Sequence, residues 1–181
     1  ITLSRIRIFK GFIGNVYSIC LSPDDRLLLS SGFIIDWRLN GDIKLWNTYT
    51  GEEIISYGPF FSRVFHSVSI SHNRKYALFG DSKGDIILCD LFTGYWIKKF
   101  IGHKDGISSL SFSLNNKSVL SSSWDQTLKL WDIEKGETIK TFAGHATFIN
   151  SACYSPNGQL ILSGDADGEM ILWDPEKGNM I

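Results

Sequence analysis

The sequence predicts an all-β protein, a β-propeller with four four-stranded blades in this chain, and three observations support this fold class. Four segments align along the 181 residues, and their anchor serines Ser22, Ser71, Ser113 and Ser155 are 49, 42 and 42 residues apart. Apolar and polar residues alternate within each segment, as they do in strands with one buried face. A glycine recurs near the end of each unit. A repeat of roughly 40–45 residues with four strand signals is one propeller blade.

The composition fits a folded protein with a buried core. Hydrophobic residues make up 43% of the chain, charged residues make up 20%, and the formal net charge is −1. Binding to nucleic acid needs clustered cations, and a membrane span needs about 18 consecutive apolar residues. We find neither pattern and expect no nucleic acid and no membrane as partners. The three cysteines are too few for a disulfide framework, which favours free thiols in a reducing compartment and hence a cytoplasmic location.

The repeats divide residues 1–181 into units of one propeller segment. The units span residues 11–57, 58–100, 101–142 and 143–181, and the first carries six extra residues, Phe33–Arg38. Residues 4–12 align with residues 137–145, so residues 1–10 are predicted to be the outer strand of a preceding blade. Residues 178–181 stand where the outer strand of the last blade should begin. We therefore expect a larger ring, closed by further repeats or, as a second choice, by another copy of the chain. A four-bladed ring is the remaining alternative.

Side-chain size along the strands predicts how the blades are oriented. One face of the first strand is small in every unit, which suits a position near a narrow central axis. These small residues are Ser18, Cys20, Ser67, Ser69, Ser109, Ser111, Ser151 and Cys153. One face of the third strand is bulky and would pack blade against blade, and it consists of Ile43, Leu45, Ile86, Leu88, Leu128, Leu130, Met170 and Leu172. The recurring glycines are Gly51, Gly94, Gly136 and Gly178, placed where a turn needs a positive φ.

Two dipeptides connect the repeats to a known family. Gly102-His103 precedes Trp131-Asp132, and Gly144-His145 precedes Trp173-Asp174 with the same separation. These GH and WD pairs on a 42-residue period resemble the signature of the WD-repeat propellers. The resemblance covers nearly the whole chain, although two units match closely, one matches partly and one matches poorly.

The same histidines raise the alternative of a catalytic site. His103, Ser121 and Asp125 offer a Ser-His-Asp nucleophile set, and the fourth unit offers the set again at the same spacing. This duplication argues against catalysis, because an enzyme rarely builds a complete copy of its site in every structural repeat. The resemblance implies instead a structural tetrad that runs from a turn Asp to His, from His to a strand Ser, and from Ser to Trp. The two predicted tetrads are His103, Ser121, Asp125 and Trp131, and His145, Ser163, Asp167 and Trp173.

The first two units depart from the tetrad pattern. Phe12 and Phe61 stand at the position of the histidine. The first unit keeps Ser30, Asn40 and Trp46, whereas the second has Phe79, Lys83 and Cys89. Loss of all partners together can be nearly neutral, while one unsatisfied buried group costs about 1–3 kcal/mol. The sequence therefore favours a structural network over a chemical one.

No metal, cofactor or catalytic residue is predicted. Residues 165–168 resemble the opening of a calcium loop, but the glycine comes too early and no Glu follows at the twelfth position. The four histidines are far apart in sequence and have no nearby Cys or His, unlike the ligands of a zinc site. The sequence also contains no phosphate-binding or dinucleotide-binding fingerprint. We therefore predict a protein that is not an enzyme.

The loop faces of the propeller remain as candidate sites, because loops on a rigid scaffold carry function. In the family, partners commonly dock on the face formed by the loops before the first strand and between the second and third strands. The resemblance places on this face Tyr17, Trp37, Leu39, His66, Trp124, Phe148 and Asn150. Aromatic anchors dominate interface energetics. Trp124 is expected to point outward, and the alternative is that Trp124 or Phe148 packs on a neighbouring loop.

From these observations we predict a scaffold or sensor module that binds a protein or a peptide. The alternative is a regulatory module joined to an enzyme, such as a nucleotide-driven switch protein or a kinase. A hydrolase that uses the His103 set is a third, formal alternative.

Overall fold

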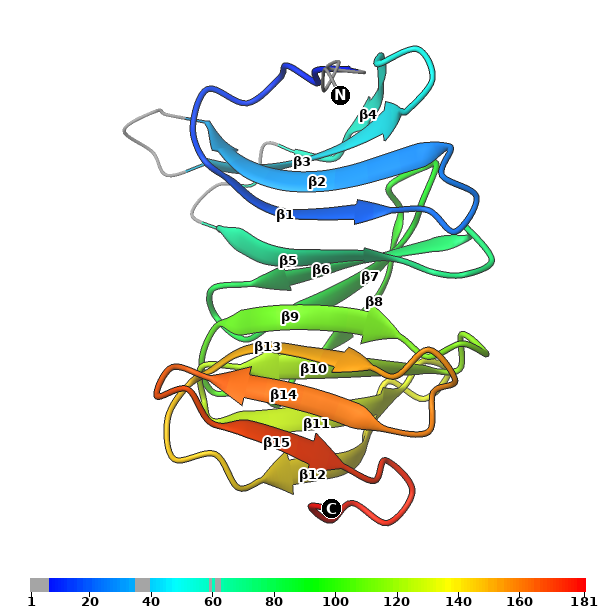
Figure 1. The fold of residues 1–181 in the computed structure, drawn as a ribbon. Coiled ribbons are helices and arrows are strands. Elements are labelled where there is room, and N and C mark those ends of the chain that lie inside the picture. The colour runs from blue at the N-terminus through cyan, green and yellow to red at the C-terminus, as the bar shows by residue number, and fades with distance from the viewer. Residues whose placement is uncertain (1–6, 35–39, 59, 61–62) are drawn as a thin grey trace, which may run out of the picture.

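Four antiparallel sheets lie side by side in the computed structural model (Figure 1), which describes residues 7–34, 40–58, 60 and 63–181. Each sheet is one blade, and the blades follow one another in chain order. The described chain starts beside the first blade and ends beside the fourth, at the opposite end of the stack. All the elements are strands, and the described residues contain no helix suited to crossing a bilayer. The predicted all-β propeller arrangement is confirmed.

The strands of each blade are hydrogen-bonded in chain order. Blade 1 consists of β1 (Val16–Leu21), β2 (Leu27–Ile34), β3 (Asn40–Asn47) and β4 (Glu53–Ser56). Blade 2 consists of β5 (Phe65–Ile70), β6 (Tyr76–Asp81), β7 (Ile86–Asp90) and β8 (Trp96–Phe100). Blade 3 consists of β9 (Ile107–Phe112), β10 (Ser118–Ser123), β11 (Thr127–Asp132) and β12 (Thr138–Ala143). Blade 4 consists of β13 (Ile149–Tyr154), β14 (Ile161–Asp165) and β15 (Met170–Trp173).

Blade 4 has three strands, where four were predicted. Met180 forms a single bridge to Trp173, at the position where Thr138 of β12 pairs with Trp131 in blade 3. One further backbone bond runs from the N–H of Ile181 to Leu172. Among the described residues, the outer-strand position of blade 4 therefore holds this bridge and this one bond.

The six extra residues of the first unit lengthen a hairpin. β2 and β3 have eight residues each, against six each in β10 and β11, and their pairing extends to Ile34 and Asn40. Phe33, the first of the six extra residues, belongs to β2 and is half-buried. Trp37 and Leu39, two of the residues predicted on the partner face, lie outside the described residues.

Apolar side chains form a core between each pair of neighbouring blades. Ile43 of β3 packs against blade 2, Ile86 of β7 packs in the core with blade 3, and Leu128 of β11 packs in the core with blade 4. All three are fully buried, as the bulky face of the third strand predicted. Burial of such a side chain contributes roughly 1.5–3 kcal/mol to stability, so these cores hold the blades in a fixed order.

The turn glycines close the last hairpin of each unit. Gly51, Gly94, Gly136 and Gly178 have φ values of 79°, 70°, 78° and 82°. Side chains are disfavoured in this left-handed region, which is why glycine recurs there. The predicted turn is present in all four units.

Candidate functional site

The loop before β9 and the hairpin of β10 and β11 bring together four side chains in blade 3. His103 Nε2 lies 2.7 Å from Ser121 Oγ, and His103 Nδ1 lies 2.8 Å from Asp125 Oδ2. Trp131 Nε1 donates to the same Ser121 Oγ at 2.8 Å. Because a carboxylate only accepts, Nδ1 carries the proton and Nε2 accepts from the serine hydroxyl. These contacts tie the loop to two strands.

Blade 4 builds the same network with a different carboxylate. His145 Nε2 lies 2.7 Å from Ser163 Oγ, and Trp173 Nε1 donates to that oxygen at 2.8 Å. His145 Nδ1 lies 2.8 Å from Asp165 Oδ2, so the assignment of Asp167 to this tetrad is corrected.

The reason for the correction is where the carboxylate stands in the hairpin. Asp165 is the last residue of β14, and the other oxygen of its side chain accepts the backbone N–H groups of Asp167 and Glu169 at 3.1 and 2.9 Å. In blade 3 the same position holds Ser123, whose short side chain accepts from the N–H of Asp125 instead. The turn residue Asp125 therefore supplies the carboxylate there.

Both tetrad carboxylates are held in their ionised form. Burial raises the pKa of Asp125, but hydrogen bonds from His103, from Thr127 and from the N–H of Lys104 outweigh it and hold this pKa well below its usual range. The pKa of Asp165 is lowered in the same way, because the donors around it, led by His145, outweigh the effect of burial.

Blade 2 contains a polar network that the sequence analysis missed. Phe61 lies outside the described residues, but the fully buried Asp81 ends β6, as Asp165 ends β14, and pairs with Arg63. Asp81 also accepts the N–H groups of Lys83 and Asp85, each at 2.9 Å. The aligned positions of Asp81 and Asp165 were the signal in the sequence. Blade 2 has therefore kept the strand-end carboxylate and exchanged its partner.

Apolar groups fill the rest of the tetrad position in blade 2. Phe79 and Cys89 are fully buried in the core between blades 1 and 2. Burial raises the pKa of the Cys89 thiol to about 12, so this cysteine stays protonated near neutral pH.

Blade 1 keeps half of the tetrad. Trp46 Nε1 donates to Ser30 Oγ at 2.7 Å, as in blades 3 and 4. The ring of Phe12 lies edge-on to Trp46, with 6.5 Å between centroids, much as His103 and His145 lie against the tryptophans of blades 3 and 4. Ser30 therefore has one polar side-chain partner where Ser121 has two.

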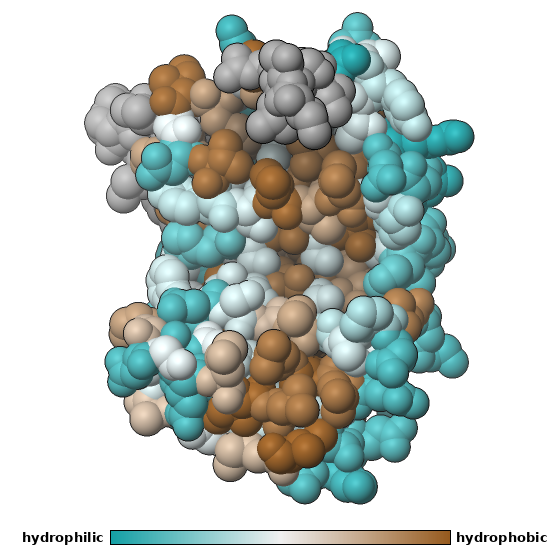
Figure 2. Space-filling view, in the orientation of Figure 1, coloured by the Kyte–Doolittle hydropathy of each residue, from teal (hydrophilic) through white to brown (hydrophobic). Residues whose placement is uncertain are grey.

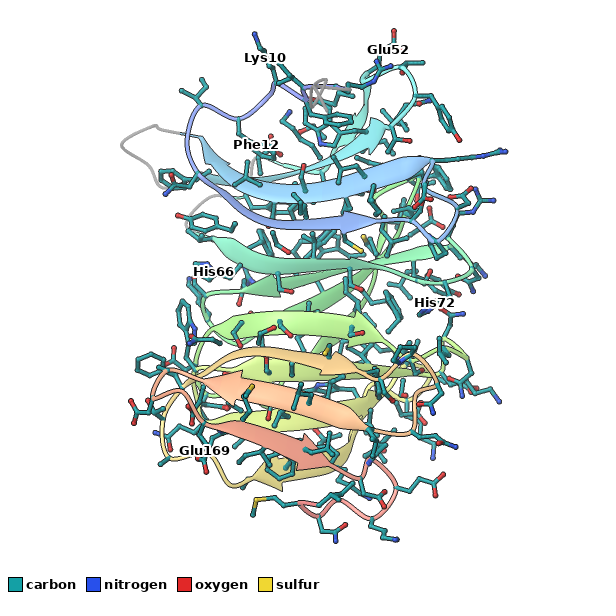
Figure 3. The ribbon with its side chains drawn as sticks, in the orientation of Figure 1. Lys10, Phe12, Glu52, His66, His72 and Glu169 are labelled. Atoms are coloured by element: carbon teal, nitrogen blue, oxygen red, sulfur yellow. The ribbon has the colours of Figure 1, made fainter. Side chains whose placement is uncertain are left out.

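Three rings from three consecutive blades form a row on the predicted partner face. Tyr17 of β1 meets His66 of β5 edge-on at 5.0 Å between ring centroids, and His66 meets Trp124 at 4.8 Å. We call Tyr17, His66 and Trp124 the aromatic row. Figure 3 shows His66 on one side of the stack and His72 on the other, so the row lies at the start of the inner strands, away from the turn that follows β5.

Trp124 was expected to point outward, but its ring lies against neighbouring residues. Its half-buried ring lies over Gly106, where an added β-carbon would be 2.6 Å from the ring. The alternative, packing on a neighbouring loop, describes its contacts with Gly106 and His66 better. In blade 4, Phe148 and Asn150, which were also predicted on this face, are exposed.

Among the described residues, one cluster has the donor types of a metal site. Ligand atoms of His145, Asp165 and Glu169 lie within 4.8 Å of one another. The Nδ1 of His145 already donates to Asp165 within the tetrad. A cation bound to that nitrogen would have to replace this hydrogen bond, so the geometry favours the tetrad.

A family model matches most of the chain. The model described as WD domain, G-beta repeat, matches residues 3–47, 94–132 and 136–174. The unmatched residues 48–93 include β5, β6 and β7. In this part of the chain, the Arg63–Asp81 pair is present where blades 3 and 4 have the tetrad. No curated protein matches the sequence.

Proposed function

Because the chain belongs to the WD-repeat family, we propose that it is a non-catalytic scaffold or sensor that binds a protein or peptide. Propellers of this family are generally protein-interaction scaffolds. We place the binding site on the face that carries the aromatic row. The row itself is the observation that supports this proposal. Its three rings come from three blades and rest on one another, so they offer a rigid platform. Rigid aromatic side chains supply large contact areas at low entropic cost, which is why they dominate binding hot spots.

The geometry of the tetrads supports a non-catalytic role. The distances among Ser121, His103 and Asp125 are those of a nucleophile set. However, Ser121 is fully buried, and its oxygen accepts a hydrogen bond from Trp131. A substrate cannot reach this oxygen without unfolding the blade. Blade 4 repeats the arrangement at the buried Ser163, as a structural device would.

Peptide selection followed by measured affinities tests the proposed face. Peptides are selected from a random library on the wild-type protein, and their dissociation constants are then measured for Tyr17→Ala/Trp124→Ala. Loss of hot-spot anchors costs about 2 kcal/mol or more, so binding should weaken by about 30-fold. The control is Tyr49→Ala/Phe92→Ala, which removes two exposed rings that follow β3 and β7. The control should bind like the wild type.

Two outcomes contradict the proposal. Equal binding by both double variants would show that the aromatic row is not used. Loss of binding by the control alone would move the site to the turns after β3 and β7. Thermal melts of both variants ensure that a lost affinity is not a lost fold.

A further inference from the structure

The outer strand of blade 2 carries exposed apolar side chains at a place that further repeats would not cover. Blade 2 lies between blades 1 and 3 (Figure 1), and apolar cores cover both of its faces. Figure 2 shows other apolar side chains gathered over blades 1 and 4, the two end blades, where an additional blade would pack. The outer edge of β8 faces away from both neighbouring blades, so its exposure needs another explanation.

Three consecutive side chains form the exposed surface. Tyr95, Trp96 and Ile97 are 79%, 50% and 48% exposed, and we call them the β8 patch. Natural proteins usually protect an edge strand with charged side chains, because an unprotected edge recruits other strands. A contiguous apolar patch on the surface commonly marks an interaction site. The β8 patch therefore has the character of a binding surface.

The outer strands of blades 1 and 3 are polar where blade 2 is aromatic. Each of the three outer strands has an irregularity opposite the same position of the third strand, and the residue paired there is Trp96 in blade 2, Glu53 in blade 1 and Thr138 in blade 3. One residue earlier, at the position of Tyr95, both other blades have a glutamate. Blades 1 and 3 form the same sheet without aromatic side chains here, so the architecture of the blade does not explain them.

Contacts with blade 3 hold β8 in a fixed position. The ring of Phe100 meets Trp131 at 5.8 Å between centroids and an angle of 63°. Lys98 donates a hydrogen bond to the backbone carbonyl of Glu134. The outer strand β12 makes both contacts with blade 4 in the same way. A binding edge that is already ordered loses little conformational entropy when a partner arrives, which favours affinity.

The free edge of β8 selects an extended partner. β8 pairs with β7 on one side, and no strand of the described residues pairs with it on the other. Every second residue of an edge strand directs its N–H and C=O groups outward, where an added strand can bond to them. The irregularity at Trp96 lies at the start of β8 and leaves the regular pairs from Lys98 to Phe100 intact.

The first half of β8 offers apolar contacts on both sides of the strand. Towards blade 1, the ring of Trp96 stacks on Phe60 with 6.1 Å between centroids and an angle of 29°. Towards blade 3, Ile97 lines an open groove together with Tyr76 and Ile133. Successive side chains of an added strand alternate between these two sides. Apolar residues of such a strand would therefore find an apolar surface on either side.

The second half of β8 is basic. Lys98 and Lys99 directly follow the β8 patch. Each lysine already has one partner, the carbonyl of Glu134 for Lys98 and the carboxylate of Asp85 for Lys99. An ammonium group has three donors, so both lysines can take a further acceptor. Opposite charges on directly facing residues of neighbouring strands are favourable, and an added strand should therefore carry acidic residues here.

From these observations we propose that the outer edge of blade 2 is a second binding site, which takes an extended segment of another protein as a fifth strand beside β8. The segment has an apolar half that covers the β8 patch and an acidic half that lies beside Lys98 and Lys99. Backbone hydrogen bonds supply affinity, and the two halves supply specificity. The site is independent of the aromatic row, which lies at the start of the inner strands, because β8 is the outermost strand of its sheet.

Synthetic octapeptides test the chemistry of the site. The probe set has three valine, isoleucine or aromatic residues next to two glutamates, in both orders, with threonine elsewhere, and the control set has lysine in place of glutamate. We expect the wild-type chain to bind members of the probe set alone. Tyr95→Glu/Trp96→Thr gives β8 the residues of β12 and should weaken binding by about 30-fold, because aromatic anchors are lost. The matched control Glu137→Ala/Thr138→Ala changes the same positions of β12 and should bind like the wild type.

N-methylated peptides test the backbone pairing on the unaltered protein. N-methylation of every second amide removes the donors from one edge of the peptide, and the pattern shifted by one residue removes them from the other edge. An added strand pairs through one edge, so one series should lose binding and the other should keep it. Equal affinities of the two series would overturn the proposal.

Other results of the binding experiments would also overturn the proposal. No binding by the glutamate peptides, or equal binding by the lysine peptides, contradicts the stated partner. Loss of binding in Tyr17→Ala/Trp124→Ala, with unchanged binding in the β8 variant, places these peptides on the aromatic row. Binding of phosphatidylserine vesicles through the β8 patch, without peptide binding, assigns the patch to a membrane surface. Thermal melts of each variant ensure that a lost affinity is not a lost fold.

Discussion

Replacing Ser121 by alanine should lower the free energy of unfolding more than the same change at Ser30. Ser121 belongs to a full tetrad, whereas Ser30 belongs to half of one. The substitution removes one oxygen, which accepts from Trp131 Nε1 and donates to His103 Nε2. Both nitrogens are buried, and within the described part of the chain neither has a second hydrogen-bond partner. Each unsatisfied group costs about 1–3 kcal/mol, and we expect a total of about 3 kcal/mol. For a chain of this length, 1 kcal/mol corresponds to about 2–4 °C in Tm, so Tm should fall by about 6–12 °C.

Ser30→Ala is the matched control within the same chain. Ser30 is buried, sits at the same place in blade 1 and accepts from Trp46 Nε1 at 2.7 Å, but Phe12 replaces the histidine. Only one polar side chain loses its partner, so we expect about half the cost, near 1.5 kcal/mol. Urea denaturation of both variants gives the two free energies. Equal costs at the two serines, or a cost below about 0.5 kcal/mol at Ser121, would refute the tetrad as a stabilising network.

Three further predictions concern ionisation, the corrected carboxylate and the thiols. Because the folded pKa of Asp125 is depressed, the native state should lose stability as the pH falls below the ordinary carboxyl pKa of about 3.9. Asp125→Asn should reduce this loss of stability at low pH, as measured by urea midpoints from pH 7 to pH 3. Asp165→Ala should lower Tm clearly whereas Asp167→Ala should barely change it, since only the former side chain accepts from His145; the reverse order would restore the original assignment. Under native conditions a thiol reagent should label the exposed Cys153 quickly and the buried Cys89 only after unfolding, which mass spectrometry of the labelled peptides can check.

The blade architecture could be predicted from the sequence because it depends on features that recur. The bulky third-strand positions, the turn glycines and the His103 network each repeat at a fixed spacing, and packing between similar blades leaves few other solutions. Met170 shows the limit of this reasoning. Its position predicted packing against a blade, but Met170 is 74% exposed. Packing also needs a neighbouring surface, and a residue pattern does not supply one.

The details that sequence reasoning missed concern which of two equivalent groups reaches a partner. Alignment placed the carboxylate of the second tetrad at Asp167, in the turn, whereas Asp165 at the strand end stands closer to His145. Arg63 has no counterpart in the other units, so no repeated pattern pointed to its pairing with Asp81. In both cases the outcome depends on side-chain reach over a few ångströms, which spacing along the chain does not encode.

The outer-strand contacts have a consequence for how this protein can be divided. The family matches at residues 94–132 and 136–174 begin with the outer strands of blades 2 and 3, β8 and β12 respectively. Each match then continues through the three inner strands of the following blade. The unit that the family model matches is therefore offset by one strand from the unit that folds as a sheet. A truncation at a sequence-repeat boundary would strip β8 or β12 from its own sheet while leaving Phe100 or Phe142 attached to the neighbour's tryptophan. C-terminal deletions should end after an outer strand, so that each remaining sheet of blades 1–3 keeps its four strands. The chain segment that runs from each outer strand to the next blade then also holds successive blades together.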